Sequence, residues 1–104
     1  MNETTIFRAL GDPTRCAVYE KLASRELSVR ELTDGFAVSQ PAISQHLAVL
    51  RKAGLVSERR DGRNIYYRAR PDGLTPLLDW IDTYSAFWPD RLGRLKSLMR
   101  EQKP

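Results

Sequence analysis

The chain has 104 residues, of which 41% are hydrophobic and 29% are charged, and its formal net charge is +4 at pH 7. This composition is typical of one soluble globular domain, and no apolar run approaches the roughly 18 residues that a transmembrane helix needs. The N-terminus lacks the layout of a signal peptide, and the single cysteine, Cys16, cannot form an internal disulfide. Both features predict a cytoplasmic protein without a membrane partner. The positive charge favours an anionic partner, so the positions of the basic residues matter.

Two helices are predicted at the start of the chain. The first covers about residues 4–10 and ends at Gly11. Asp12 and Pro13 then have the chemistry of a helix cap and a first helical position, because Asp accepts free backbone N–H groups and Pro has none to leave unpaired. The second helix should run to about Ser24. Its candidates for burial are Cys16, Val18, Tyr19 and Leu22.

A pair of helices joined by a tight turn is predicted next. Ser28 and Glu31 have the spacing of a capping box, which opens a short helix of about residues 29–34 that Gly35 stops. A second helix follows after a compact apolar turn and begins at Ser39 or Gln40. Pro41 falls in its first turn, where a proline is tolerated and marks the start of a helix.

The rest of the chain predicts a hairpin and then a long helical stretch. Gly54 occupies the position of a C-terminal cap glycine. Strands of about residues 55–60 and 63–69 flank Asp61-Gly62, a strong signal for a two-residue turn. Residues 74–101 have apolar side chains at helical spacing, and Pro89 within them predicts a kink or two consecutive helices.

The helix of about residues 40–53 divides into two faces when its residues are spaced about 100° apart. One face carries Ile43, Leu47 and Leu50, with His46 at its edge. The opposite face carries Pro41, Ser44, Gln45, Ala48 and Lys52, with Arg51 beside it. Amides and hydroxyls can bond to base edges in the major groove, and a helix N-terminus attracts phosphate. This pattern indicates a helix that lies against DNA.

The predicted fold class is therefore mostly α with a small β-hairpin, a winged helix-turn-helix in one domain of residues 1–104. The helix-turn-helix covers about residues 28–53, the wing about 55–69, and a C-terminal dimerisation helix or helices about 74–101. Arginines gather around the turn of the wing, where they can reach phosphates or a narrow minor groove. The candidate contacts to double-stranded DNA are Ser39, Gln40, Pro41, Ser44, Gln45, Arg51, Lys52, Arg59, Arg60 and Arg63.

Three segments resemble the ArsR-type family of bacterial winged-helix transcriptional repressors. They are LGDPTR (residues 10–15), SQPAISQHLAVLRKAGLV (residues 39–56) and RRDGRNIYY (residues 59–67). The segment YSAFWPDRLGRL looks like the tail of the metal-independent branch of that family. The resemblance implies a homodimer, paired through its first and last helices, that binds a pseudo-twofold operator and represses transcription.

The usual sensor sites of that family are not matched. Ser28 and Arg30 stand at the positions where metal-sensing members often carry a Cys-x-Cys pair, and residues 74–101 contain no histidine. A thiol switch needs two cysteines. The sequence therefore predicts no metal site and no cofactor, and it identifies no inducer. Two alternatives stay open: a metal- or small-molecule-sensing repressor of the same fold, and a winged helix that binds another protein.

The remaining residues of interest have mainly structural interpretations. His46 is expected to be partly buried and hydrogen-bonded beside the turn, with a phosphate contact as the alternative. No constellation of catalytic residues is visible, so the chain is not expected to be an enzyme. The last helix is apolar over so wide an arc that it predicts two packing partners, one of them across a dimer. The candidate interface residues are Ile6, Phe7, Leu10, Trp80, Tyr84 and Phe87.

Overall fold

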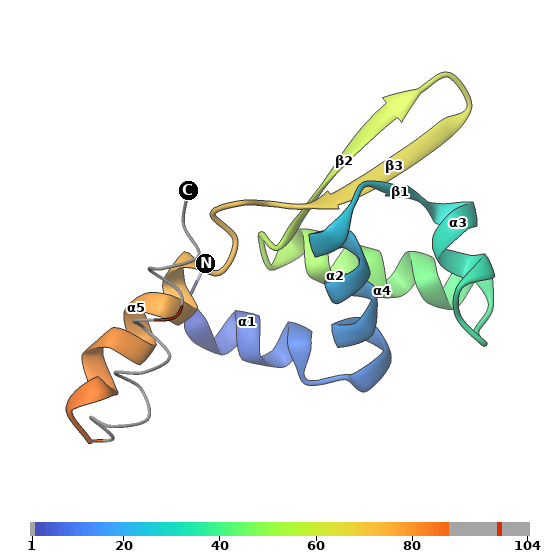
Figure 1. Ribbon diagram of the computed structural model, residues 1–104. Coiled ribbons are helices and arrows are strands. Elements are labelled where there is room, and N and C mark those ends of the chain that lie inside the picture. Colours follow the sequence, from blue (N-terminus) through green and yellow to red (C-terminus); the bar gives the residue numbers. More distant parts are fainter. Residues whose placement is uncertain (1, 88–97, 99–104) are drawn as a thin grey trace.

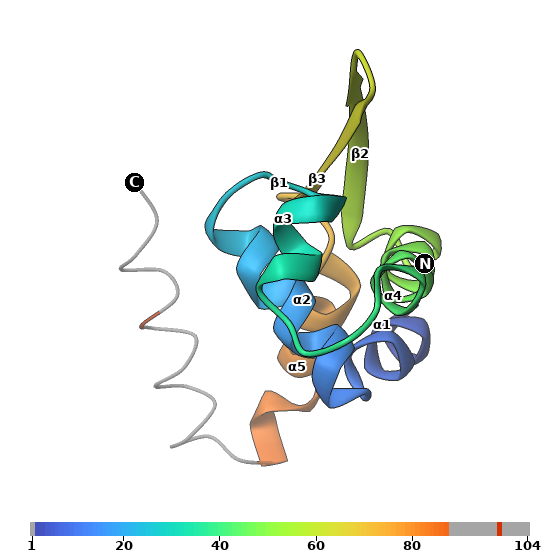
Figure 2. The same ribbon diagram turned by 90° about the vertical axis from the view of Figure 1, so that its right-hand side faces the viewer.

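A computed structural model describes residues 2–87 and Leu98. The elements are α1 (Glu3–Leu10), α2 (Pro13–Ser24), β1 (Leu27–Ser28), α3 (Val29–Asp34), α4 (Gln40–Lys52), β2 (Val56–Asp61), β3 (Asn64–Ala69), α5 (Thr75–Tyr84) and the 3₁₀ turn η1 (Ser85–Phe87). All but β1 and η1 are predicted, and in this order. The helices form the body, and the β2–β3 hairpin projects from it as a wing (Figures 1 and 2). Among the described helices, none has the length and apolar character needed to cross a bilayer.

The helix starts are those that the sequence predicts. The side chain of Asp12 accepts the backbone N–H of Arg15, and the side chain of Ser39 accepts that of Ala42. At α3 the capping box is complete, because Ser28 and Glu31 each bond the other's backbone N–H. Each cap satisfies N–H groups that a helix leaves unpaired at its first turn.

One apolar core holds the body together. It draws on α1, α2, α3 and α4 and on the strand start at Leu55 and Val56, and α4 supplies three side chains with no exposed surface: Ile43, Leu47 and Leu50. Val18 and Leu22 are buried as predicted. Cys16, which is also predicted to be buried, is only half-buried. Its Sγ lies 3.8 Å from Oε1 of the exposed Glu20, one turn further along α2.

The wing differs from the prediction by one residue. Asp61 pairs with Asn64, so the two-residue loop is Gly62-Arg63 instead of the predicted Asp61-Gly62. Gly62 has a φ of +63°, and Gly54 after α4 has a φ of +75°. Both positions need the left-handed conformation that glycine adopts without strain, and the register places that conformation at the first loop residue.

A third strand, which the sequence does not predict, connects the wing to the body. The two residues of β1 pair antiparallel with β3, in the order β1-β3-β2. Ser28 both ends β1 and caps α3, so strand and helix follow one another without a loop. Two residues are too few to show an alternating pattern in the sequence.

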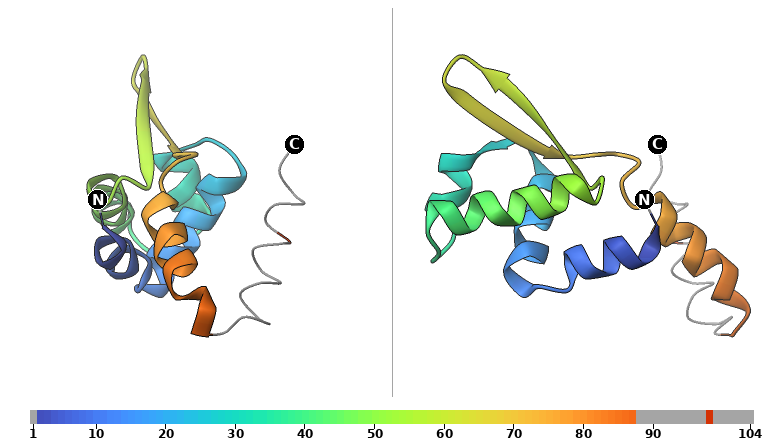
Figure 3. Two further views of the ribbon diagram at one scale, coloured as in Figure 1. Left: turned by 90° about the vertical axis from the view of Figure 1, so that its left-hand side faces the viewer. Right: turned by 180° about the vertical axis from the view of Figure 1, so that it is seen from behind.

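The last predicted helix is shorter than expected within the described residues. Helix α5 ends at Tyr84, and η1 follows it. The backbone N–H of Ser85 donates to Asp82 O, three residues back, which is the tighter pattern of a 3₁₀ helix that η1 continues. The remainder of the predicted stretch, including the kink at Pro89, lies outside the described residues. Helices α5 and α3 lie at opposite ends of the molecule (Figures 1 and 3).

Candidate nucleic-acid interface

Helix α4 has one fully buried apolar face and, on its opposite side, an exposed polar face. The side chains opposite Ile43, Leu47 and Leu50 are exposed, and they are Gln40, Pro41, Ser44, Gln45, Arg51 and Lys52. This is the division that the sequence predicts, apart from Ala48, which is half-buried, and Val49, which is 39% exposed. The exposed face is polar and basic rather than acidic, which does not favour the alternative of a protein-binding module.

Three of the predicted contacts, Ser39, Gln40 and Pro41, lie at the start of α4. The Ser39 hydroxyl accepts the backbone N–H of Ala42 at 3.3 Å, so this side chain is already used as a cap. Pro41 is exposed in the first turn. The N-terminal end of α4 also carries the positive end of the helix dipole, which attracts anions.

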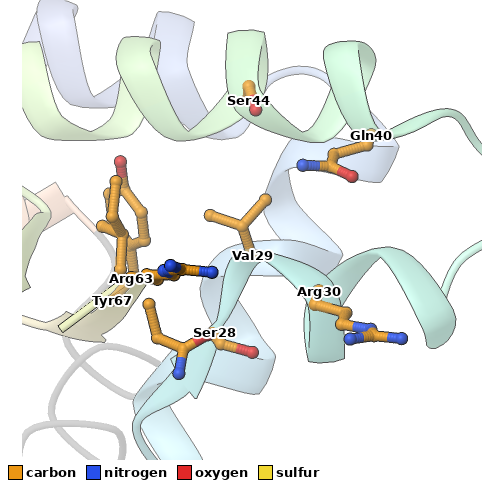
Figure 4. Close-up of a pocket in the computed structure, with 9 residues that line it drawn as sticks. Ser28, Val29, Arg30, Gln40, Ser44, Arg63 and Tyr67 are labelled. Atoms are coloured by element: carbon orange, nitrogen blue, oxygen red, sulfur yellow. The ribbon is translucent and has the colours of Figure 1, made fainter. Parts of the chain in front are cut away.

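A cleft of about 280 Å³ lies between α3, α4 and the wing. Gln40 and Ser44 line it from α4, and Arg63 and Tyr67 line it from the wing, with Val29 of α3 between them (Figure 4). Its walls thus offer amide, hydroxyl and guanidinium donors, the groups that bind base edges and phosphates.

Six lining residues are absent from the sites that the sequence predicts: Ser28, Val29, Arg30, Asn64, Ile65 and Tyr67. Two of them, Arg30 and Tyr67, have long side chains that can donate hydrogen bonds. Arg30 is exposed on α3 at the rim of the cleft, and Tyr67 lies on β3. The sequence could have indicated Arg30 as a site residue, because it is the second residue of the first helix in the predicted helix-turn-helix and follows the apolar Val29. No sequence signal marks Tyr67, whose role depends on how the wing folds back toward α4.

The arginines around the turn of the wing fall into two groups. Arg59 is held against the body: its Nη2 and Nε donate to the two carboxylate oxygens of Glu26 at 2.6 and 3.2 Å, and its guanidinium lies 4.8 Å from the centre of the Tyr66 ring. The hydrogen bond from Arg59 lowers the pKa of Glu26. By contrast, Arg60 and Arg63 are exposed and have no carboxylate partner within 4.0 Å among the described residues. These two cations near the wing tip are available to an anionic ligand.

The cations at the end of α4 also differ. Arg51 Nη1 lies 2.8 Å from Glu58 Oε1, so its charge is offset. Lys52 is exposed and has no carboxylate within 4.0 Å in the part of the chain that the structure describes. Of the predicted DNA contacts, Arg51 and Arg59 are thus engaged inside the protein, whereas Lys52, Arg60 and Arg63 are available.

His46 is partly buried, as predicted, with 19% of its side chain exposed. Its neighbour is Asp12 at the start of α2, with 4.0 Å between His46 Nε2 and Asp12 Oδ2, and not a group in the turn. Within residues 2–87, no group of three or more His, Cys, Asp or Glu side chains could hold a metal ion. The Ser28 hydroxyl accepts the backbone N–H of Glu31 at 3.1 Å, so it is committed to its cap.

A row of aromatic rings lies at the other end of the molecule, and we call it the aromatic surface. Ring centroids are 5.4 Å apart for Phe7 and Trp80, 5.0 Å for Trp80 and Tyr84, and 6.1 Å for Tyr84 and Phe87. These four side chains are between 37% and 72% exposed. Of the other predicted interface residues, Leu10 is half-buried against the core. Ile6 has no exposed surface, so it packs inside the protomer instead of contributing to an interface.

Comparison with known proteins agrees with this architecture. The profile of the family described as bacterial regulatory protein, arsR family, matches residues 12–58. The HTH-type transcriptional regulator KmtR of Mycobacterium tuberculosis is 47% identical over 73 residues, which make up 70% of this chain and 56% of KmtR. The transcriptional repressor SdpR of Bacillus subtilis is 32% identical over 76 residues, which make up 73% of this chain and 84% of SdpR.

A solved structure described as a possible transcriptional regulator for arsenical resistance matches with a TM-score of 0.69 and 44% identity, covering 88% of this chain and 92% of that one. The chain spans 56% of the length of KmtR, little more than half. These relatives are transcriptional regulators, in agreement with the expectation that the chain is not an enzyme. The matched profile, the identity to SdpR over most of its length and the shared winged helix show that this chain belongs to the ArsR family of bacterial regulatory proteins.

Proposed function

We propose that the protein is a homodimeric transcriptional repressor that binds operator DNA in the bacterial cytoplasm. The observation that carries the proposal is the exposed polar face of α4, which adjoins the cleft beneath the wing. Family membership supports a regulator that acts on DNA. The opposite face of α4 is fully buried, and on the exposed face Gln40, Ser44, Gln45 and Lys52 are accessible to a ligand.

In this proposal α4 enters the major groove. Gln40, Ser44 and Gln45 contact base edges, because they are exposed and carry amide or hydroxyl groups. Arg63 and Lys52 contact phosphates on either side of the helix, and Arg60 adds a contact from the wing. Phosphate contacts supply most of the affinity and make it salt-dependent, whereas the α4 side chains supply the sequence preference.

Homodimerisation is supported by the aromatic surface. Its four partly exposed rings lie in a row, and a contiguous exposed apolar patch of this kind often marks a protein–protein contact. A twofold axis at this surface would place the two α3–α4 units at the far ends of the dimer (Figure 1). Two α4 helices could then enter successive major grooves, which are about 34–36 Å apart.

We also propose that operator binding needs no metal ion. Ser28 and Arg30 replace the thiol pair that metal-sensing members often carry, and Ser28 is used by its capping box. The signal that releases the protein from its operator would then act at a site other than the positions of Ser28 and Arg30. Titration of zinc and of a chelator into the protein–operator complex should leave its dissociation constant unchanged.

The function is tested by titrating the protein against DNA from its own promoter region and against scrambled DNA at two salt concentrations. Tight binding that prefers the promoter and weakens with salt is the expected result. Equal, weak binding to both DNAs, with or without a cell extract of small molecules, would contradict a repressor of its own promoter.

A further inference from the structure

One carboxylate connects the wing to α4, the recognition helix of the proposed function. Glu58 on β2 accepts a hydrogen bond from Arg51 Nη1 at 2.8 Å through one oxygen, and from the Tyr67 hydroxyl at 3.0 Å through the other. Arg51 lies in the last turn of α4 and Tyr67 lies on β3. The side chain of Glu58 on β2 therefore joins one side chain of α4 to one of β3.

The register of the wing makes this connection direct. Glu58 and Tyr67 stand opposite each other in the β2–β3 ladder, so their side chains lie on the same face of the hairpin. Val56, two residues before Glu58 on that face, is buried in the core. Tyr67 also lines the cleft that contains Gln40 and Ser44. A group that fixes Tyr67 relative to α4 therefore fixes one wall of the cleft.

The opposite face of the hairpin is fixed by the next residue. Consecutive side chains in a strand point to opposite faces, so Arg59 projects away from Glu58 and reaches Glu26 at 2.6 Å. The base of the wing is thus bound on both faces. Arg60 and Arg63, nearer the tip, are exposed and available to a ligand.

The charge of Glu58 needs an explanation on a surface that binds an anion. A free carboxylate there would repel phosphates, yet this one is only 36% exposed and is bound by a cation and a hydroxyl. Arg51 in turn has its charge offset and makes no net contribution to phosphate attraction. Both residues therefore fit a role inside the protein better than a role at the DNA.

We propose that Glu58 is a positioning residue: by binding Arg51 and Tyr67 together it sets the angle between the wing and the recognition helix. The proposal rests on the function proposed above and adds to it the residue that shapes the cleft. Arg51 accordingly acts through Glu58 and does not contact a phosphate, in contrast to the prediction from the sequence.

The first test is Glu58→Gln, with Asp61→Asn as the matched control, because each removes one negative charge from β2. Asp61 is 71% exposed and lies at the tip. We expect Glu58→Gln to weaken operator binding by about three- to tenfold, since an incompletely fixed wing costs affinity, while Asp61→Asn binds as tightly as the unaltered protein or slightly tighter. The slope of affinity against salt should stay the same in both. Tighter binding or a steeper slope for Glu58→Gln would mean that Glu58 merely repels DNA, and would overturn the proposal.

The second test exchanges the two charges. Arg51→Glu alone and Glu58→Arg alone should each weaken operator binding, because each places like charges side by side. The double variant keeps the net charge and restores an ion pair, so we expect it to recover most of the affinity of the unaltered protein. If the double variant binds as weakly as Arg51→Glu, Arg51 contacts DNA directly and the proposal is wrong.

A third measurement needs no DNA and separates this proposal from the proposed function. Backbone amide relaxation at Gly62 reports motion of the wing tip. We expect a lower order parameter in Glu58→Gln than in Asp61→Asn, with unchanged circular dichroism in both. Unchanged relaxation in Glu58→Gln would overturn the positioning role, whereas failure of the unaltered protein to prefer its promoter would overturn only the proposed function.

Discussion

His46 Nε2 of α4 lies 4.0 Å from Asp12 Oδ2, the same oxygen that accepts the backbone N–H of Arg15 at 2.8 Å. One carboxylate therefore both caps α2 and faces the middle of α4. The bond from Arg15 lowers the pKa of Asp12 below its ordinary value of 3.8, and the neighbouring His46 also lowers it. A group with a lowered pKa stabilises the folded state while it is ionised.

The first prediction concerns this carboxylate. Asp12→Asn keeps an oxygen that can cap α2 but cannot ionise. The contribution of the Asp12 charge is present above its ordinary pKa of 3.8 and is lost as the pH falls through the lowered value. We expect the variant to melt at a lower temperature than the unaltered protein near neutral pH, and the two melting temperatures to converge in acid. Thermal melts followed by circular dichroism check this, and a gap that stays constant down to about pH 3 would show that the charge plays no part.

The second prediction concerns the buried face of α4. Leu47 has no exposed surface, so Leu47→Ala removes buried methyl groups and leaves a cavity. We expect a loss of about 2–5 kcal/mol in the free energy of unfolding, measured by urea denaturation. Val49→Ala is the control, because Val49 lies on the same helix and is 39% exposed. Its loss should be within about 0.5 kcal/mol. Equal losses would contradict the orientation of α4.

Sequence preference gives the third prediction. Gln45 is exposed on α4 and carries an amide that can both donate and accept. Gln45→Ala should cost about 1–3 kcal/mol for the preferred operator and remove the discrimination at one base pair. Binding to a panel of single-base operator variants measures this. An unchanged ranking of the panel would show that Gln45 faces solvent in the complex.

The wing gives the fourth prediction, with a different signature. Arg63 is exposed and lines the cleft, so Arg63→Gln should weaken binding to all sequences alike. The slope of log affinity against log salt should become shallower by about 0.9, because one phosphate fewer is neutralised in the complex. Weaker binding to the preferred operator only, with no change in slope, would instead indicate that Arg63 binds a base.

The aromatic surface gives the fifth prediction. Trp80 contacts both Phe7 and Tyr84 and is 37% exposed, close to the 39% of Val49. Trp80→Ala should raise the dimer dissociation constant by about tenfold or more, because a central tryptophan often dominates an interface. Val49→Ala should leave it unchanged. Sedimentation equilibrium measures both, and a monomeric unaltered protein would contradict the proposed dimer itself.

The features that the sequence predicts well are those determined by neighbouring residues. Asp12-Pro13, Ser28 with Glu31, and Gly54 each act within one helical turn, and the structure confirms all of them. The buried face of α4 can be predicted from the sequence just as well, because the helical period of 3.6 residues determines which side chains share a face. Local chemistry therefore suffices for the helix-turn-helix.

What the sequence does not predict depends on residues far apart in the chain. Arg59 and Glu26 are 33 residues apart, and nothing in either segment indicates that they meet. The predicted turn of the wing is wrong by one residue because Asp61-Gly62 and Gly62-Arg63 both contain the glycine, and only the cross-strand register decides between them. The placement of Ile6 at an interface fails for the same reason, since α1 alone does not reveal which side packs on the core.

The direct succession of β1 and α3 has a consequence for building chimeric regulators. Ser28 belongs to the strand that pairs with Tyr66 of β3 and also starts the helix, so this junction offers no flexible joint where a foreign helix pair could be inserted. A graft of residues 29–53 alone would separate α3 from Ser28, which both caps it and pairs with β3. The grafted helix would then start from a strand of the host protein that belongs to a different sheet. The exchangeable unit is therefore the continuous segment of residues 26–69, which carries the strand, the helix pair and the hairpin that holds them.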